Sequence, residues 1–283
     1  MRAIARERAP ASPEIERRLL AKYHLDEPIW KQYLEYMRDL VVHWDLGTST
    51  KYRDHSVNDI IAQGLPVSLT LGGLAFCFAL GLGLPVGFFT AANRGRWPDR
   101  LLGVVSLGGL SFPNFALGPI LILIFSIELG WLPVSGAGTG RIFGPRCWLY
   151  LILPAITLGS GLAGVLTRMV RTAMLEELVQ DYIRTARAKG LSERTVVYRH
   201  ALGNALIPVL TVLGLQFGSL LAGAIVTETV FSWPGIGRLT LSAISNRDYA
   251  LVQGCILAVG MTYVAVNLLT DAAYTFANPR MRA

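Results

Sequence analysis

Positions 65–92 read LPVSLTLGGLAFCFALGLGLPVGFFTAA, a stretch of 28 residues without aspartate, glutamate, lysine or arginine. About 20 apolar residues in an α-helix cross the roughly 30 Å hydrocarbon core of a bilayer. This stretch is therefore long enough to span a membrane as one helix. Four further uncharged runs reach a similar length, and together the five define the predicted spans: 65–92, 101–127, 147–167, 204–227 and 249–270.

The composition of the whole chain points the same way. Of its 283 residues, 52% are hydrophobic and 16% are charged, whereas a soluble domain has about 45–50% and about 25%. A helix on the surface of a soluble protein keeps a polar face, which these runs lack. A membrane β-barrel needs segments of about 10 residues with alternating polarity, and the runs do not alternate. We predict an all-α polytopic membrane protein with five transmembrane helices.

The basic residues predict its orientation, because lysine and arginine concentrate in short cytoplasmic loops. The first connection (93–100), the third (168–203) and the C-terminal tail together carry twelve lysines and arginines, whereas the second and fourth connections carry four. The sequence therefore places the C-terminus and the third connection in the cytoplasm. The net charge of +7 is explained by this distribution, so no nucleic-acid partner is expected.

Residues 1–64 differ from the rest, because their ten basic and ten acidic residues cancel. We divide the chain into an extracytoplasmic helical segment (1–64) and a transmembrane domain (65–283). Helix starts are predicted at Ser12-Pro13-Glu14 and at Glu27-Pro28, since serine caps a helix and proline suits its first position. The two helices are expected to lie on the membrane or on a neighbouring subunit.

The predicted orientation raises the question of how residues 1–64 cross the membrane. Five spans and a cytoplasmic C-terminus put residues 1–64 outside, yet the sequence starts MRAIARERAP, which has no apolar region able to carry them across. We therefore expect a first spanning helix to be encoded upstream of Met1.

Catalytic and metal-binding residues are not expected in this chain. The four histidines lie outside the predicted spans, and the three cysteines have no metal-ligand spacing. A phosphate-binding loop requires lysine after glycine, and none of the four lysines follows glycine. Charged groups near the membrane centre, which coupled carriers usually possess, are missing from the predicted spans. Any energy for transport must come from another subunit, and no cofactor is expected here.

The third connection has its own organisation. Its sequence LEELVQDYIRTARAKGLSERTVVYRHALGNALIPVL predicts two helical pieces that are hinged at Gly190. Charge alone favours a solvated helix pair at the membrane surface. A bracket that engages a cytoplasmic partner is the alternative.

Several strings together favour the second interpretation. TARAKGLS followed by HALGNALIPV resembles the coupling-loop signature of ABC-importer permeases, in the branch that transports dipeptides, oligopeptides, nickel and related solutes. The same branch is resembled, in the same order, by six further strings: ASPEIERRLLAKYHLDEPIWKQYLEYMRDLV, GLPVSLTLGGLAF, RWPDRLLGVVSLGGLSFPNFALG, LGWLPVSGAG, ETVFSWPGIGRLTLSAISNRDYALVQG and NPRMR. The resemblance covers roughly residues 12–282. Members of this family normally have six spans, which again suggests that a first helix is missing.

The resemblance implies specific roles for two groups of residues. A helix of the third connection would dock into a cleft of a cytoplasmic ATPase, with a small residue at Ala186 allowing close approach and Gly190 allowing a turn. The residues implied in this contact are Arg184, Thr185, Ala186, Arg187, Ala188, Lys189, Gly190, Leu191 and Ser192. The fourth connection would receive solute at an external mouth formed by Phe231, Trp233 and Arg238.

The resemblance also implies a location in the inner membrane of a prokaryotic cell and an assembly there. Its parts would be a second homologous permease, two cytoplasmic ATPases that bind ATP, an extracytoplasmic solute-binding protein and the surrounding lipid. The solute would be a peptide, nickel chelate, glutathione or oligosaccharide. The competing hypothesis is a channel or scaffold subunit that works without ATP, and an ATPase that co-elutes with the chain would distinguish the two.

Overall fold

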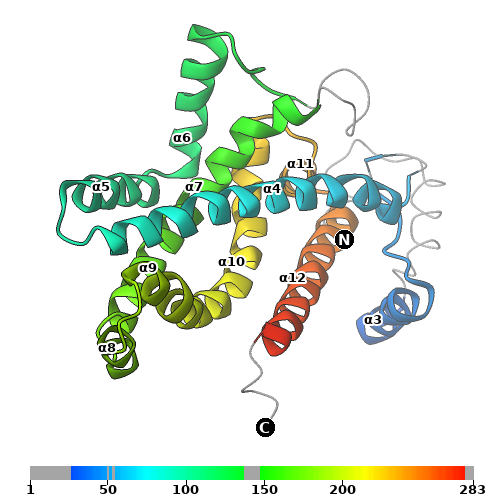
Figure 1. The fold of residues 1–283 in the computed structure, drawn as a ribbon. Coiled ribbons are helices and arrows are strands. Elements are labelled where there is room, and N and C mark those ends of the chain that lie inside the picture. Colours follow the sequence, from blue (N-terminus) through cyan, green and yellow to red (C-terminus); the bar gives the residue numbers. More distant parts are fainter. Residues whose placement is uncertain (1–26, 50, 53–54, 137–146, 278–283) are drawn as a thin grey trace.

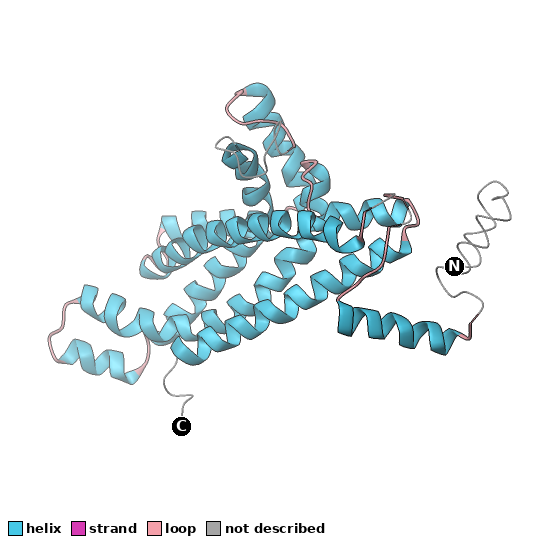
Figure 2. Cartoon of the chain, turned by 90° about the vertical axis from the view of Figure 1, so that its right-hand side faces the viewer, coloured by secondary structure: helices cyan, strands magenta, loops and turns pink. Residues whose placement is uncertain are grey.

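A computed structural model describes residues 27–49, 51–52, 55–136 and 147–277. Within these ranges the chain is helical, and its extended pairing is a single bridge between Thr48 and Ser56, as Figure 2 shows. The prediction of an all-α protein is confirmed. The helices, with π-helical turns marked η, are α3 (Ile29–Arg38), η1 (Asp39–His43), α4 (Val57–Ala92), α5 (Trp97–Ser111), α6 (Asn114–Leu121), η2 (Ile122–Glu128), α7 (Cys147–Glu177), α8 (Asp181–Ala188), α9 (Glu193–Thr195), η3 (Val196–Ala201), α10 (Leu202–Val230), α11 (Ile236–Ser245) and α12 (Tyr249–Ala277).

The centre of the fold is the packing of α4 against α7, which cross in Figure 1. Small residues recur every fourth position along α4, so they share one face of the helix. They make a close approach possible: a Cβ added at Gly83 would lie 2.8 Å from Leu166 Cβ, and one at Gly87 would lie 2.7 Å from the carbonyl oxygen of Thr167. Small facing residues are the usual means by which helices associate in lipid. The stripe on α4 is Ala75, Ala79, Gly83, Gly87 and Ala91, and the stripe on α7 is Ala155, Gly159, Ala163 and Thr167.

Four of the five predicted spans each lie within one helix. The runs 65–92, 147–167, 204–227 and 249–270 fall in α4, α7, α10 and α12. Among the residues whose side chains are described, α4, α7 and the part of α12 up to Thr270 are long and apolar enough to cross a membrane. The helices extend beyond the uncharged runs, so α4 begins at Val57 and the proposed domain boundary at residue 64 falls inside it.

The span predicted over 101–127 requires correction, because the structure divides it. Helix α5 ends at Ser111, and α6 begins at Asn114 and continues into η2. Phe112 precedes Pro113 and is extended, with φ −81° and ψ 118°, since the proline ring disfavours a helical residue before it. Figure 1 shows α5 and α6 running in different directions, so this stretch is a bent pair of helices.

The segment before α4 contains one of the predicted helices and is tied to the start of α12 through Ser49. The helix predicted to start at Ser12 lies outside the described residues, whereas the start predicted at Glu27-Pro28 is confirmed by α3. Ser56 caps α4 by accepting a hydrogen bond from the Asp59 amide at 3.0 Å. Ser49 donates to the buried carboxylate of Asp248, before the first turn of α12. Ser49 is thereby held near the turn that joins α11 to α12.

Candidate functional site

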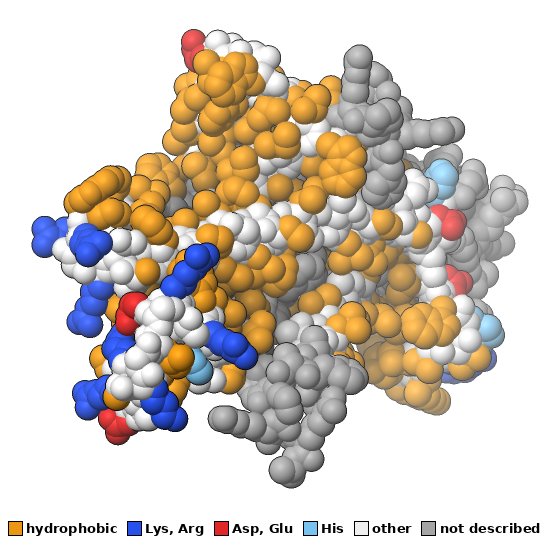
Figure 3. Space-filling view, viewed as in Figure 1, with side chains coloured by type: hydrophobic (Ala, Val, Ile, Leu, Met, Phe, Trp, Pro, Cys, Tyr) orange, Lys and Arg blue, Asp and Glu red, His pale blue; other side chains and the backbone are white. Residues whose placement is uncertain are grey.

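The predicted bracket in the third connection is a compact projection from the ends of α7 and α10, at the lower left of Figure 1. Helix α7 continues ten residues beyond its uncharged run before it ends at Glu177, and α8, α9 and η3 follow. Arginine and lysine side chains gather over this projection and over nearby α5 in Figure 3. On the face shown in Figure 3, the positive charge of the described residues is therefore concentrated at this end of the bundle.

Gly190 separates the two helical pieces, as predicted. Its φ of +77° lies in the left-handed region, which favours glycine. The Leu191 amide donates to the Ala186 carbonyl at 3.4 Å, and the Gly190 amide donates to the Arg187 carbonyl at 2.9 Å. These two bonds form the Schellman motif that ends many helices. A Cβ at Gly190 would meet nothing within 4 Å, so glycine is favoured here by the backbone conformation and not by lack of space.

An ion pair braces this turn. The Nε of Arg187 donates to Oε2 of Glu193 at 3.1 Å, and its Nη2 donates to Oε1 at 2.6 Å. This two-point geometry is the strongest form of an arginine–carboxylate contact. The hydrogen bonds with Arg187 lower the pKa of the Glu193 carboxyl. Ser192 also caps α9 by accepting a hydrogen bond from the Thr195 amide at 3.3 Å.

Tyr182 fastens the bracket to the spans. Its hydroxyl contacts the carboxylate of Glu177 at the end of α7 and accepts a hydrogen bond from Asn204 Nδ2, in α10, at 3.0 Å. On the other side of α8, Ile183 is fully buried. A ring contact of 4.6 Å between Phe88 and Tyr198 joins η3 to the last turns of α4. The bracket is therefore connected to three long helices.

The residues implied in ATPase coupling divide into two groups. Ala186 is 6% exposed and belongs to the core of this chain. The expectation that its small side chain lets a partner approach is therefore corrected: Ala186 is small because α8 packs on its own chain. The exposed group is Arg184, Thr185, Arg187, Ala188, Lys189, Gly190, Leu191 and Ser192.

A second ion pair joins the same end of α5 and α7. Asp99 Oδ1 accepts from Arg171 Nε at 2.8 Å, and Oδ2 accepts from Arg171 Nη2 at 3.0 Å and from the Gly95 amide at 2.9 Å. Asp99 precedes the uncharged run of its helix and is buried. The bonds with Arg171 lower the pKa of the Asp99 carboxyl to about 2, so it stays ionised at neutral pH.

The three residues predicted for an external mouth do not form one together. The side chains of Phe231 and Trp233 are 2% and 1% exposed, so they fill the interior where α10 ends, and this prediction is corrected for both. Arg238 is exposed, and its Nη1 donates to the Ser232 carbonyl at 2.7 Å. The aromatic residues stabilise the turn between α10 and α11 because their apolar area is removed from water.

Sequence reasoning missed Glu228, which organises the same turn. Its carboxylate is completely buried, accepts from the Ser68 hydroxyl of α4 and accepts from the Arg238 amide of α11 at 3.0 Å. A Cβ at Gly235 would lie 2.1 Å from Glu228 Oε1, so glycine is needed for this approach. The carboxylate lies at the positive end of the α11 dipole. The only clue in the sequence was a charge directly after the uncharged run 204–227.

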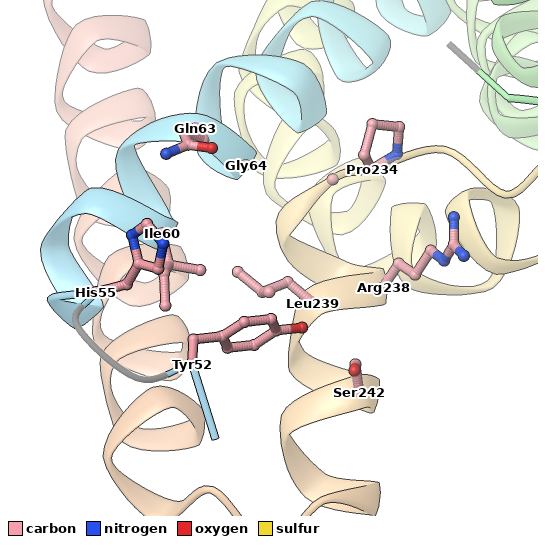
Figure 4. Close-up of a pocket in the computed structure, with 10 residues that line it drawn as sticks. Tyr52, His55, Ile60, Gln63, Gly64, Pro234, Arg238, Leu239 and Ser242 are labelled. Carbon is pink, nitrogen blue, oxygen red and sulfur yellow. The ribbon is translucent and has the colours of Figure 1, made fainter. Parts of the chain in front are cut away.

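A shallow pocket lies beside this turn, between the start of α4 and α11. Figure 4 shows the Tyr52 side chain extending toward Leu239, and His55 lines the same pocket. Gln63 and Arg238 also line it. Among the described residues, no group of three or more histidine, cysteine, aspartate or glutamate side chains is placed to hold a metal ion. The wall of the pocket combines polar side chains, such as Gln63, with apolar ones, such as Leu239.

Comparisons with known proteins agree with this architecture. The chain is 43% identical to the glutathione transport system permease protein GsiC of Escherichia coli K12 over 258 residues, which cover 91% of this chain and 81% of the relative. Its identity to GsiC of Salmonella paratyphi A is 41% over 276 residues, covering 96% and 87%.

A solved structure of the MetNI methionine ABC transporter, in an inward-facing conformation, shares the fold. Its TM-score is 0.64 at 18% identity, covering 77% of this chain and 96% of that one. Residues 83–283 match the family described as binding-protein-dependent transport system inner membrane component. These matches confirm the resemblance to ABC-importer permeases. The chain belongs to the family of binding-protein-dependent transport system inner membrane components.

Proposed function

We propose that this permease drives solute uptake by transmitting motion from cytoplasmic ATPases through the α8–Gly190–α9 bracket. The observation that carries the proposal is the exposed surface formed by residues 184, 185 and 187–192, on a bracket that is fixed to α4, α7 and α10. An exposed surface on a stiff support suits a mechanical contact. The bracket itself needs no catalytic residue for this task.

The stiffness of the bracket supports this role. A force on α8 reaches α10 through the hydrogen bond between Tyr182 and Asn204, and reaches α7 directly through the three-residue connection 178–180. The Arg187–Glu193 pair keeps the two sides of Gly190 from moving independently. Coupling between distant sites requires such a contiguous set of contacts between elements that have two arrangements. Movement of the bracket would then rotate the spans that line the path.

ATP would be bound and hydrolysed by separate subunits. None of the chain's four lysines follows glycine, so it lacks a phosphate-binding loop of the Gly-Lys-Ser or Gly-Lys-Thr type. The proposed assembly has a second homologous permease, two ATPases on the cytoplasmic side and a solute-binding protein on the opposite side. The C-terminus would lie in the cytoplasm with the bracket, in keeping with the distribution of basic residues.

The solute would be a small peptide or a related compound. The relatives from E. coli and Salmonella are named for glutathione, which is itself a small peptide. The uncharged runs that predicted the spans provide hydroxyl groups, backbone and aromatic rings for the path. An uncharged lining suits a solute whose charged groups are recognised by a separate binding protein and not by the transport path.

The test is to purify the chain with its native neighbours and reconstitute the complex into liposomes. We expect an ATPase to co-elute with the chain. We also expect uptake of labelled glutathione or of a short peptide to require ATP on the side of the liposome membrane where the ATPase lies. Solute movement without nucleotide, in a preparation that lacks an ATPase, would support a channel and contradict the proposal. Failure to transport either solute while ATP hydrolysis responds to a binding protein would leave the coupling intact and reject the solute class.

A further inference from the structure

Helix α3 and η1 form an amphipathic segment at the edge of the molecule, in Figures 1 and 2. None of their residues is buried. Ile29, Trp30, Tyr33 and Leu34 are 84%, 65%, 60% and 57% exposed. Because residues three and four apart lie on the same side of a helix, these side chains form one continuous apolar face, and Figure 3 shows hydrophobic side chains gathered there.

The opposite face of the segment is charged, and its charges are paired locally. Lys31 contacts Glu27 at 2.6 Å, and Asp39 contacts both Arg38 at 3.3 Å and His43 at 3.4 Å. Ion pairs of this kind belong to a surface that faces water. The segment therefore has one side suited to water and one side that remains apolar and uncovered.

Its length and charge exclude a crossing of the membrane. Ten residues of α3 and five of η1 extend for about 22 Å at about 1.5 Å per residue, which is less than the roughly 30 Å of hydrocarbon. Crossing would also place Lys31, Glu35 and Arg38 in lipid. A helix with one apolar and one charged face instead lies in the plane of the membrane interface.

The end of the segment is fixed at the level where α4 approaches the membrane. The Leu46 amide donates to Asn58 Oδ1 at 3.0 Å, the Val57 amide donates to the Gly47 carbonyl at 3.0 Å, and Asn58 also donates to the Trp44 carbonyl. The uncharged run of α4 starts at residue 65, eight residues or roughly 12 Å further along the helix. The C-terminal end of the segment is therefore fixed close to the point where α4 enters its uncharged run.

We propose that α3 and η1 lie on the bilayer surface opposite the α8 bracket, with the face of Ile29, Trp30, Tyr33 and Leu34 inserted among lipid headgroups and upper acyl chains. The last turns of α4 contact η3 near the bracket, so the start of α4 lies on the other side of the membrane. Trp30 and Tyr33 suit this depth because their rings are apolar and their N–H and O–H groups reach water or headgroups. The segment would hold the first turn of α4 at a fixed depth.

The test uses spin labels at Ile29→Cys and, as a control on the opposite, charged face of the same helix, at Arg38→Cys. Both are placed in a chain whose three native cysteines are replaced by alanine, and the complex with its native partners is reconstituted in phosphatidylethanolamine–phosphatidylglycerol nanodiscs. Collision rates with oxygen, which enriches in lipid, and with a nickel chelate, which stays in water, are then measured.

We expect the ratio of oxygen to nickel collisions to be several-fold higher at position 29 than at position 38. Equal ratios at the two positions would show that the segment lies in water and would overturn the proposal. Low collision rates with both reagents at position 29 would indicate a covering protein, such as a second permease or a binding protein, and would also overturn it. Tyr33→Cys and Glu35→Cys, which also lie on opposite faces, provide a second pair if either first variant fails to assemble.

Discussion

Arg187 and Glu193 are joined by two hydrogen bonds, of 3.1 and 2.6 Å, that close across the left-handed residue Gly190. The pair links α8 and α9 into one unit. Both side chains remain partly exposed, and exposed ion pairs are worth only about 0–1 kcal/mol. The pair therefore matters more for the geometry of the turn than for the stability of the fold. The shape of this unit is what we propose a partner ATPase recognises.

Substitution of Gly190 tests whether that shape matters. We expect Gly190→Val to prevent association with the ATPase and to abolish uptake, because a β-branched residue at φ +77° is strained by about 1–3 kcal/mol. The measurement is co-elution of the ATPase together with ATP-dependent uptake in liposomes. Gly190→Asn is the matched control, since asparagine tolerates the left-handed region and a Cβ there meets no neighbour. Equal uptake by the valine and asparagine variants would contradict the coupling role.

Substitutions of two alanines in α8 test the stability of the fold and the contact with the ATPase separately. Ala186 is buried in this chain and Ala188 is exposed. Ala186→Leu should lower the free energy of unfolding by about 1–3 kcal/mol through overpacking, whereas Ala188→Leu should change it by less than about 0.5 kcal/mol while weakening ATPase association. Thermal unfolding in detergent and co-elution measure the two effects. A stable Ala188→Leu variant with undiminished association would place the contact elsewhere.

The Asp99–Arg171 pair predicts a pH dependence. The pKa of Asp99 is about 2 in the folded chain against about 3.9 in an unfolded one, so the pair stabilises the fold fully above about pH 4 and is lost as the pH falls toward 2. Asp99→Asn should cost about 1.5–3 kcal/mol at pH 7, the usual value for hydrogen bonds to charged groups. The difference in melting temperature between the two proteins should narrow from pH 5 to pH 3. A constant difference would show that the carboxylate charge is unimportant.

The contact between α4 and α7 is tested by comparing two glycines in α4. Gly87→Leu should destabilise the fold by about 3 kcal/mol or prevent expression, because a Cβ would lie 2.7 Å from the Thr167 carbonyl and overpacking is costly. Gly81 lies on the exposed side of the same helix, where a Cβ meets nothing within 4 Å. Gly81→Leu should therefore fold normally in membranes. Equal yields of folded protein from both variants would mean that the small-residue stripe does not determine this packing.

Charge patterns in the sequence predicted most of the fold but not its bends. Uncharged runs identified α4, α7, α10 and α12, because lipid excludes charge along a whole helix. The break at Pro113 could not be predicted from proline alone, since Pro66, Pro85 and Pro154 all stand inside helices. Which prolines interrupt a helix depends on neighbours that satisfy the freed carbonyl groups, and these are known only from the packed structure.

The candidate site shows the same limit. The turn at Gly190 was predicted, because glycine after a run of helix-forming residues favours a helix end. The burial of Ala186 was not predicted, since it depends on which face of α8 meets η3. Glu228 was missed because the carboxylate is stabilised by Ser68, 160 residues earlier in the chain. Contacts between such distant positions leave no local pattern.

The central claim is that the exposed surface of the α8–Gly190 turn touches an ATPase. The most direct measurement places a photo-reactive amino acid at Ala188, and at Trp131 as an exposed control outside the bracket, in complexes that take up solute with ATP. We predict that irradiation cross-links position 188 to the ATP-binding subunit and does not cross-link position 131 to it. A complex active in ATP-dependent uptake whose ATPase is never captured from position 188 would contradict the account.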